Sequence, residues 1–166
     1  MVRRGGRGLR ARWVVLGIVV LVAGGVFAYL RSRGMPGVAW AARDGAERYE
    51  LLSLESYLSR PDFYNHEILG RTVVDDAGVR GRLNAALQAG VRASDGSQMA
   101  CFTPRHGIRV TRGGVTTDFV NCFECRKVQV WLADQKIAFF LVSEAPEAVF
   151  DEVLTSAGVP LAAKRH

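Results

Sequence analysis

The segment I-R-V-T-R-G-G-V-T-T-D-F-V, residues 108–120, predicts a β-hairpin. Apolar and polar side chains alternate at residues 108–111 and again at residues 115–120, with the period of two that is typical of half-buried strands. The intervening Arg112-Gly113-Gly114 has the composition of a tight turn. A turn at the two glycines places position 106 roughly opposite position 121, and position 101 roughly opposite position 126.

Segments on both sides of the hairpin predict further strands. Short apolar or β-branched runs lie at residues 49–54, 68–74, 128–132 and 137–142. Residues 60–62, which contain Pro61, are expected to end the first of these strands.

Two helices are expected, one between the strands and one near the C-terminus. Apolar residues at four-residue steps from Val79 predict a helix that ends near Arg92, with Asp75 or Asp76 as its cap. A last helix is expected to open at residues 144–147, with Ser143 as its cap. The order of elements favours an α+β domain, with a small antiparallel sheet of about five strands and two helices.

Residues 13–30 contain no charged side chain and lie between Arg12 and Arg31. As a helix, this segment would measure about 27 Å, close to the ~30 Å thickness of a bilayer core. We therefore expect one N-terminal transmembrane helix in front of the α+β domain. A cleaved signal peptide, with its cleavage site at residues 26–28 or 39–41, is the alternative, and it would export the domain as well.

Charge divides the chain into the parts expected around this segment. Seven of the 22 basic residues and no acidic one lie at or before Arg33, whereas the chain from Gly34 onward carries 15 basic and 16 acidic residues. This distribution predicts a basic cytoplasmic tail at 1–12, a linker at 31–45 and an extracytoplasmic domain at 46–166. The chain would be a single-pass protein of the bacterial cytoplasmic membrane with its N-terminus inside. A near-neutral domain argues against nucleic acid as a partner, which leaves membrane lipid and an unidentified protein.

Three cysteines and one histidine fall within 25 residues of one another: Cys101, His106, Cys122 and Cys125. The predicted hairpin brings them together at its open end. Cys122 and Cys125 form a C-x-x-C motif, the usual half of a zinc site, and Cys101 with His106 would complete a Cys3His ligand set. The alternatives are a disulfide, a reactive thiol and a purely structural cluster. A thioredoxin-type site is disfavoured, because the residues after Cys125 predict a strand and not a helix.

Arg105 lies beside His106 in a predicted turn. It is interpreted either as an anion-binding residue or as a hydrogen-bonding brace of the turn, with Glu124 as its partner. His66 beside Glu67 is interpreted as surface or loop polarity. Catalytic motifs such as G-x-S-x-G and H-E-x-x-H are absent from the sequence, so no residue is assigned a catalytic role.

The run C-F-T-P-R-H-G-I at residues 101–108, followed by C-F-E-C at residues 122–125, resembles the motif pair of a family of uncharacterised bacterial exported or membrane-anchored proteins. The resemblance covers residues 49–160. It implies that the motif positions form one structural unit, and it implies no activity, because the family has no known function.

Two functional hypotheses follow. The first is a membrane-anchored extracytoplasmic domain that binds or scaffolds a partner, is not an enzyme, and uses the Cys/His cluster as a structural staple. The second is a metal-dependent or thiol enzyme that uses Cys101, His106, Cys122 and Cys125, with zinc as the metal.

Overall fold

The computed structural model describes Arg43 and residues 45–164, except for the side chains of residues 57–61. All of these belong to the second of the two units into which the chain divides, Val38–His166. The predicted tail at 1–12, the predicted membrane segment at 13–30 and most of the predicted linker lie outside the described residues. Within the described part of the chain, no helix is long and apolar enough to cross a membrane.

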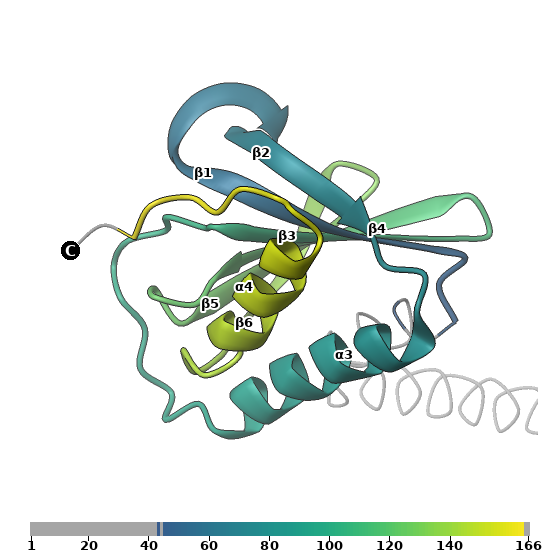
Figure 1. The fold of residues 1–166 in the computed structure, drawn as a ribbon. Coiled ribbons are helices and arrows are strands. Elements are labelled where there is room, and N and C mark those ends of the chain that lie inside the picture. The colour runs from purple at the N-terminus through teal and green to yellow at the C-terminus, as the bar shows by residue number, and fades with distance from the viewer. Residues whose placement is uncertain (1–42, 44, 165–166) are drawn as a thin grey trace, which may run out of the picture. The chain divides into compact units, whose positions relative to one another are not determined.

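The described residues form one antiparallel sheet of six strands (Figure 1). The strands follow the spatial order β2-β1-β3-β4-β5-β6. Their bounds are β1 (Arg48–Phe63), β2 (His66–Val73), β3 (His106–Arg112), β4 (Val115–Cys122), β5 (Lys127–Leu132) and β6 (Gln135–Leu141). The pairing of His106 with Asn121 between β3 and β4 confirms the register that the two turn glycines predict.

Two helices pack on one face of this sheet, which we call the helix face. Helix α3 (Ala77–Arg92) begins at Asp76, whose carboxylate accepts the backbone N–H of Val79 at 2.7 Å, so the predicted cap is confirmed. Helix α4 is Glu147–Ser156. Both helices bury an apolar stripe against alternate residues of the central strands. The largest fully buried side chains of this core are Tyr49, Leu51, Leu83, Leu87, Ile108, Phe119, Phe150 and Leu154.

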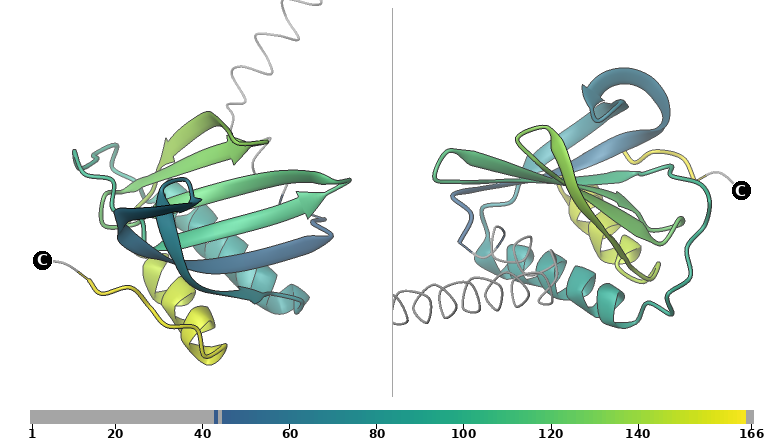
Figure 2. Two further views of the ribbon diagram at one scale, coloured as in Figure 1. Left: turned by 90° about the horizontal axis from the view of Figure 1, so that it is seen from above. Right: turned by 180° about the vertical axis from the view of Figure 1, so that it is seen from behind.

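The opposite face, which we call the hairpin face, is covered by the hairpin that β1 and β2 form. Strand β1 pairs with β3 only as far as Ser53, and beyond that point the β1–β2 hairpin curls over the sheet (Figure 2). The curl buries a second, smaller cluster made of Leu52, Leu54, Phe63 and Val120. Leu51 and Leu52 are both apolar and point to opposite faces of β1, so each face must be covered to remove them from water. The curled hairpin provides this cover on the side of Leu52.

A glycine makes room for the curled hairpin. A Cβ atom added to Gly107 would lie 2.8 Å from the ring of Phe63, closer than carbon atoms pack. The bare backbone of β3 at this position therefore allows Phe63 to lie directly on the strand.

Polar contacts hold the hairpin tip in place. Tyr64 has a positive φ in the turn between β1 and β2, and its ring stacks on Trp131 with a centroid separation of 4.2 Å. The Tyr64 hydroxyl donates to Asp118 at 2.8 Å, and Arg109 donates to both oxygens of the same buried carboxylate at 2.9 and 2.7 Å. Burial and the hydrogen bond to Asp118 raise the pKa of Tyr64 above its usual value, so this hydroxyl still donates to Asp118 at an alkaline pH at which an exposed tyrosine would ionise.

The fold predicted from the sequence needs two corrections in the sheet. The described sheet has six strands instead of about five, and it is strongly curled. The expected transmembrane helix at 13–30 lies outside the described residues, and none of the described helices could cross a membrane. Residues 60–62 do not end the first strand. This part of β1 does not pair with β3, so Pro61 has no strand on that side to which a backbone N–H would have to donate.

The last helix also starts later than predicted. Ser143 is not its cap, because the Ser143 N–H donates to the carbonyl of Gly90 in α3 at 2.9 Å and the helix begins only after Pro146. Gly90 has no side chain to keep Pro146 away, so the start of α4 sits against the end of α3.

Candidate functional site

The three cysteines meet at the connection between β4 and β5. Cys122 ends β4, Cys125 lies just before β5, and their sulfurs form a disulfide across a tight turn. The Sγ atom of Cys101, which arrives on the long connection between α3 and β3, lies 2.7 Å from Sγ of Cys125. Cys122 and Cys125 are 1% and 0% exposed, whereas Cys101 is exposed and is not part of the disulfide.

Hydrogen-bond donors surround the sulfur atoms. The backbone N–H of Cys125 donates to Sγ of Cys122 at 3.2 Å, and the N–H of Thr103 points to Sγ of Cys125 at 3.4 Å. The Thr103 hydroxyl lies 3.5 Å from Sγ of Cys125 and 3.9 Å from Sγ of Cys122. The Met99 N–H donates to the carbonyl of Cys125 at 3.2 Å, which holds the segment carrying Cys101 against the turn.

His106 does not join the sulfur atoms. Its side chain lies on the helix face, where Nε2 is 2.7 Å from Oδ1 of Asp151 in α4 and the ring packs against both Phe123 and Phe150. Burial raises the pKa of Asp151, but the hydrogen bond and charge of His106, with the charges of Arg105 and Lys164, outweigh it and lower that pKa overall. Cys122 follows Val120 by two residues on β4 and so belongs to the hairpin face, which explains the separation.

Arg105 is buried and does not pair with Glu124. Its guanidinium donates to the carboxylate of Glu147 in α4 and to the carbonyl of Ala162, at 3.0 Å from Nε and 2.7 Å from Nη2. Lys164 donates to the second oxygen of Glu147 at 2.7 Å. Arg105 therefore ties the C-terminal segment and α4 to the start of β3, and its carboxylate partner is Glu147 instead of the predicted Glu124.

A row of buried polar side chains crosses the sheet next to His106. Ser53 on β1 and Asn121 on β4 are the cross-strand partners of His106, and all three are almost completely buried. The Ser53 hydroxyl, the Asn121 amide and Nδ1 of His106 have no hydrogen-bond partner among the described residues. Serine, histidine and aspartate thus lie close together, but a nucleophile in this closed position cannot meet a substrate. Sequence motifs gave no sign of Ser53, whereas the hairpin register already placed position 121 opposite His106.

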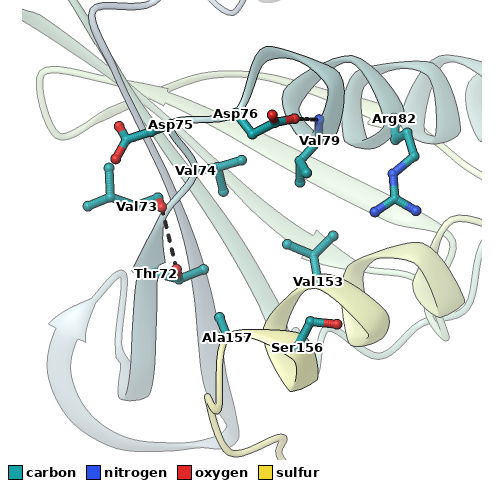
Figure 3. A pocket seen from close by; sticks show the side chains of 10 residues that line it. All are labelled: Thr72, Val73, Val74, Asp75, Asp76, Val79, Arg82, Val153, Ser156 and Ala157. Atoms are coloured by element: carbon teal, nitrogen blue, oxygen red, sulfur yellow. Dashed lines mark hydrogen bonds between the residues drawn. The ribbon is translucent and has the colours of Figure 1, made fainter.

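A separate groove opens between β2 and the two helices (Figure 3). It has a volume of about 340 Å³, within the usual range for ligand pockets. Its walls are mainly aliphatic, and Figure 3 shows Arg82 reaching toward it from α3 while Asp75 and Asp76 lie on the β2–α3 connection; the lining residues are Thr72, Val73, Val74, Asp75, Asp76, Val79, Arg82, Val153, Ser156 and Ala157. Sequence analysis did not identify this groove, because it forms from three segments that no motif connects.

The predicted Cys3His set is thus split between the two faces of the sheet. Among Arg43 and residues 45–164, no group of three or more His, Cys, Asp or Glu side chains is arranged to hold a metal ion. Comparison of the chain with protein-family models, with curated proteins and with solved structures found no match.

Proposed function

We propose that the domain is a binding module and that its binding site is the groove between β2, α3 and α4. The observation that carries this proposal is an open, largely aliphatic cavity with acidic side chains on its rim. The cavity leaves apolar surface accessible to a ligand, because Val73 lines it and has 38% of its surface exposed.

The polar residues of the groove favour binding over hydrolytic or acid–base catalysis. Its hydroxyl groups, Thr72 and Ser156, have no histidine or cysteine beside them in the lining. The carboxylate of Asp76 is already used as the cap of α3, and Arg82 is paired with Glu152 at 3.0 Å. A nucleophile needs an adjacent base to be activated, and no hydrogen bond among the described residues joins Thr72 or Ser156 to a carboxylate; the Thr72 hydroxyl donates to the carbonyl of Val73 instead.

The chemistry of the groove selects a protein segment that presents an aliphatic side chain next to a basic one. The valines accept the aliphatic group by excluding water from it. The side chain of Asp75 is 88% exposed at the rim, and its nearest cation is Arg80, at 3.8 Å. A lysine or arginine of the partner would therefore find a carboxylate beside the aliphatic contact.

We further propose that this module works outside the cytoplasm. A disulfide between Cys122 and Cys125 persists in an oxidising compartment and is rare in the reducing cytosol. The bond lies at the β4–β5 turn, away from the groove. The disulfide therefore supports export of the domain without reference to the predicted N-terminal membrane segment.

The test is a selection with the full-length chain against a displayed library of random peptides. Enriched peptides are expected to carry an aliphatic residue beside Lys or Arg, and a labelled peptide from this set provides a binding assay by fluorescence anisotropy. Val73→Arg should weaken binding by about tenfold or more, because it fills the groove and repels the basic residue. Asp75→Asn should weaken it less, because only a rim charge is lost.

Val115→Arg is the matched control. Val115 is also an exposed valine at the end of a strand, with 54% of its surface exposed, but it lies in the β3–β4 turn region and does not line the groove. Equal losses from Val73→Arg and Val115→Arg would contradict the proposed site, as would enriched peptides that lack the aliphatic–basic pair.

A further inference from the structure

Three sulfur atoms in contact, of which one is exposed, form an arrangement that a structural staple does not need. The Cys122–Cys125 disulfide is closed to solvent, and a thiol from outside cannot reach either of its sulfurs. Cys101 is exposed, and its Sγ lies 2.7 Å from Sγ of Cys125. Cys101 is therefore placed between the solvent and the buried bond.

We infer that Cys101, Cys122 and Cys125 form a thiol–disulfide exchange site that oxidises thiols of a second molecule. In the first step, the thiolate of Cys101 attacks Sγ of Cys125. A bond forms between Cys101 and Cys125, the bond between Cys125 and Cys122 breaks, and Cys122 leaves as a thiolate. The proton that Cys101 released is taken up by Cys122, so this step changes no oxidation state and needs no further reactant.

The second step uses a thiol from outside the protein. Its thiolate attacks Sγ of Cys101, which now belongs to an exposed disulfide, forms a mixed disulfide with Cys101 and releases Cys125 as a thiolate. A second external thiolate then attacks the external sulfur of the mixed disulfide and releases Cys101. The two external thiols become one disulfide, and the protein disulfide becomes two thiols, so two electrons pass from the external pair to the protein.

The surroundings of the sulfurs fit the first step. Attack on Cys125 drives negative charge onto Cys122, and the Cys125 N–H already donates to that sulfur at 3.2 Å, which stabilises the departing thiolate. Cys101 needs no large movement, because the Met99–Cys125 backbone hydrogen bond holds its segment against the turn. His106 takes no part, since it lies on the other face of the sheet with Asp151.

The site differs from thioredoxin-type chemistry in its source of reactivity. There, the dipole of a helix N-terminus activates the first cysteine of the C-x-x-C motif. Here the motif lies in a turn between two strands, and both of its sulfurs are buried. The third cysteine provides the access that the motif itself lacks.

The test follows reduction of the oxidised full-length chain, kept in mild detergent, by glutathione at about pH 8, where thiolates are abundant. Samples are quenched with acid, alkylated, and their thiols counted by mass spectrometry. Wild-type protein should lose its disulfide faster than Cys101→Ser by about tenfold or more, because the variant leaves only the buried bond. Met99→Leu is the matched control, since it changes an exposed side chain two residues from Cys101, keeps the backbone N–H of Met99 and all three cysteines, and should be reduced at the wild-type rate.

Peptide mapping gives a second readout that does not depend on turnover. In wild-type protein trapped before glutathione is added, a fraction of molecules should show a Cys101–Cys125 bond with Cys122 alkylated. Cys122→Ser should form the Cys101–Cys125 bond throughout and react rapidly with glutathione. Equal reduction rates for wild type and Cys101→Ser, no Cys101–Cys125 bond in wild type or in Cys122→Ser, or three free thiols in the isolated chain would each overturn the inference. The peptide-binding assay of the groove is independent of all these outcomes.

Discussion

The two faces of the sheet are stabilised in different ways. The helix face has the larger core, to which α3, α4 and most strands contribute, whereas the hairpin-face cluster has four buried apolar residues among the described side chains, supplemented by ring stacking and by the pairs around Asp118. Apolar burial contributes about 1.5–3 kcal/mol for each large side chain. The hairpin face therefore depends more strongly on a few polar contacts, and we expect it to open at a lower free energy than the helix face.

The largest effect is expected in the core of the helix face. Phe150 is fully buried in α4 and packs edge-to-face on Phe123 at a centroid distance of 5.0 Å. Phe150→Ala should lower the free energy of unfolding by about 3–5 kcal/mol, because it removes buried surface and leaves a cavity. Chemical denaturation measures this value. The control is Phe139→Ala in β6, where 59% of the side chain is exposed, and a comparable loss from that variant would contradict the assigned core.

A smaller effect is expected from the polar contacts of the hairpin face. Asp118→Asn replaces the carboxylate that Arg109 and Tyr64 share, so one charge-assisted pair is lost and the amide must reorganise. The free energy of unfolding should fall by about 1–3 kcal/mol. Hydrogen exchange should increase in β1 and β2 before it increases in α3 and α4.

Glu152→Gln is the control for this charge change. Glu152 pairs with Arg82 at 3.0 Å, but both side chains are more than half exposed. Exposed pairs contribute about 0–1 kcal/mol, so this variant should be close to wild type. If Asp118→Asn exchanges uniformly across the domain, the hairpin face is not a separate unit of stability.

The two faces also differ in how far the sequence predicts them. Periodicity identified the β3–β4 hairpin, its register and the α3 cap, because these depend on residues close together in the chain. The curl of β1 depends on Phe63 lying on Gly107, a contact between positions 44 residues apart in a strand that Pro61 was expected to end. Such long-range packing has no local pattern that would reveal it.

The candidate sites show the same division. The hairpin register correctly brought Cys101 near Cys125, but alternation along β4 and the position of α4 placed His106 on the opposite face with Asp151. Arg105 was expected in an exposed turn and is instead buried against Glu147, because the C-terminal segment folds back over it. The sequence thus predicts proximity along the hairpin, whereas the choice of partner depends on elements more than 40 residues away.

The smallest effect is a pH dependence confined to the hairpin face. His66 in β2 was interpreted as surface polarity, but it is buried, and its Nδ1 lies 3.3 Å from the carbonyl of Glu55. Burial lowers the pKa of His66, and the contact with Glu55 opposes that shift only in part. The unfolded chain therefore binds more protons than the folded chain as the pH falls below about 6.5, and stability decreases with it.

Unfolding of wild type and His66→Gln, measured at about pH 7.5 and about pH 5.5, checks this sign. Carboxylates remain largely ionised over this interval, and His106 is present in both proteins, so the difference between the two curves isolates His66. The variant should lose less stability than wild type on acidification, because its side chain does not titrate. In wild type, the increase in hydrogen exchange at the lower pH should appear in β1 and β2. Parallel pH curves for the two proteins would mean that His66 is as accessible to protons in the folded chain as in the unfolded one, and that the hairpin face is already open at neutral pH.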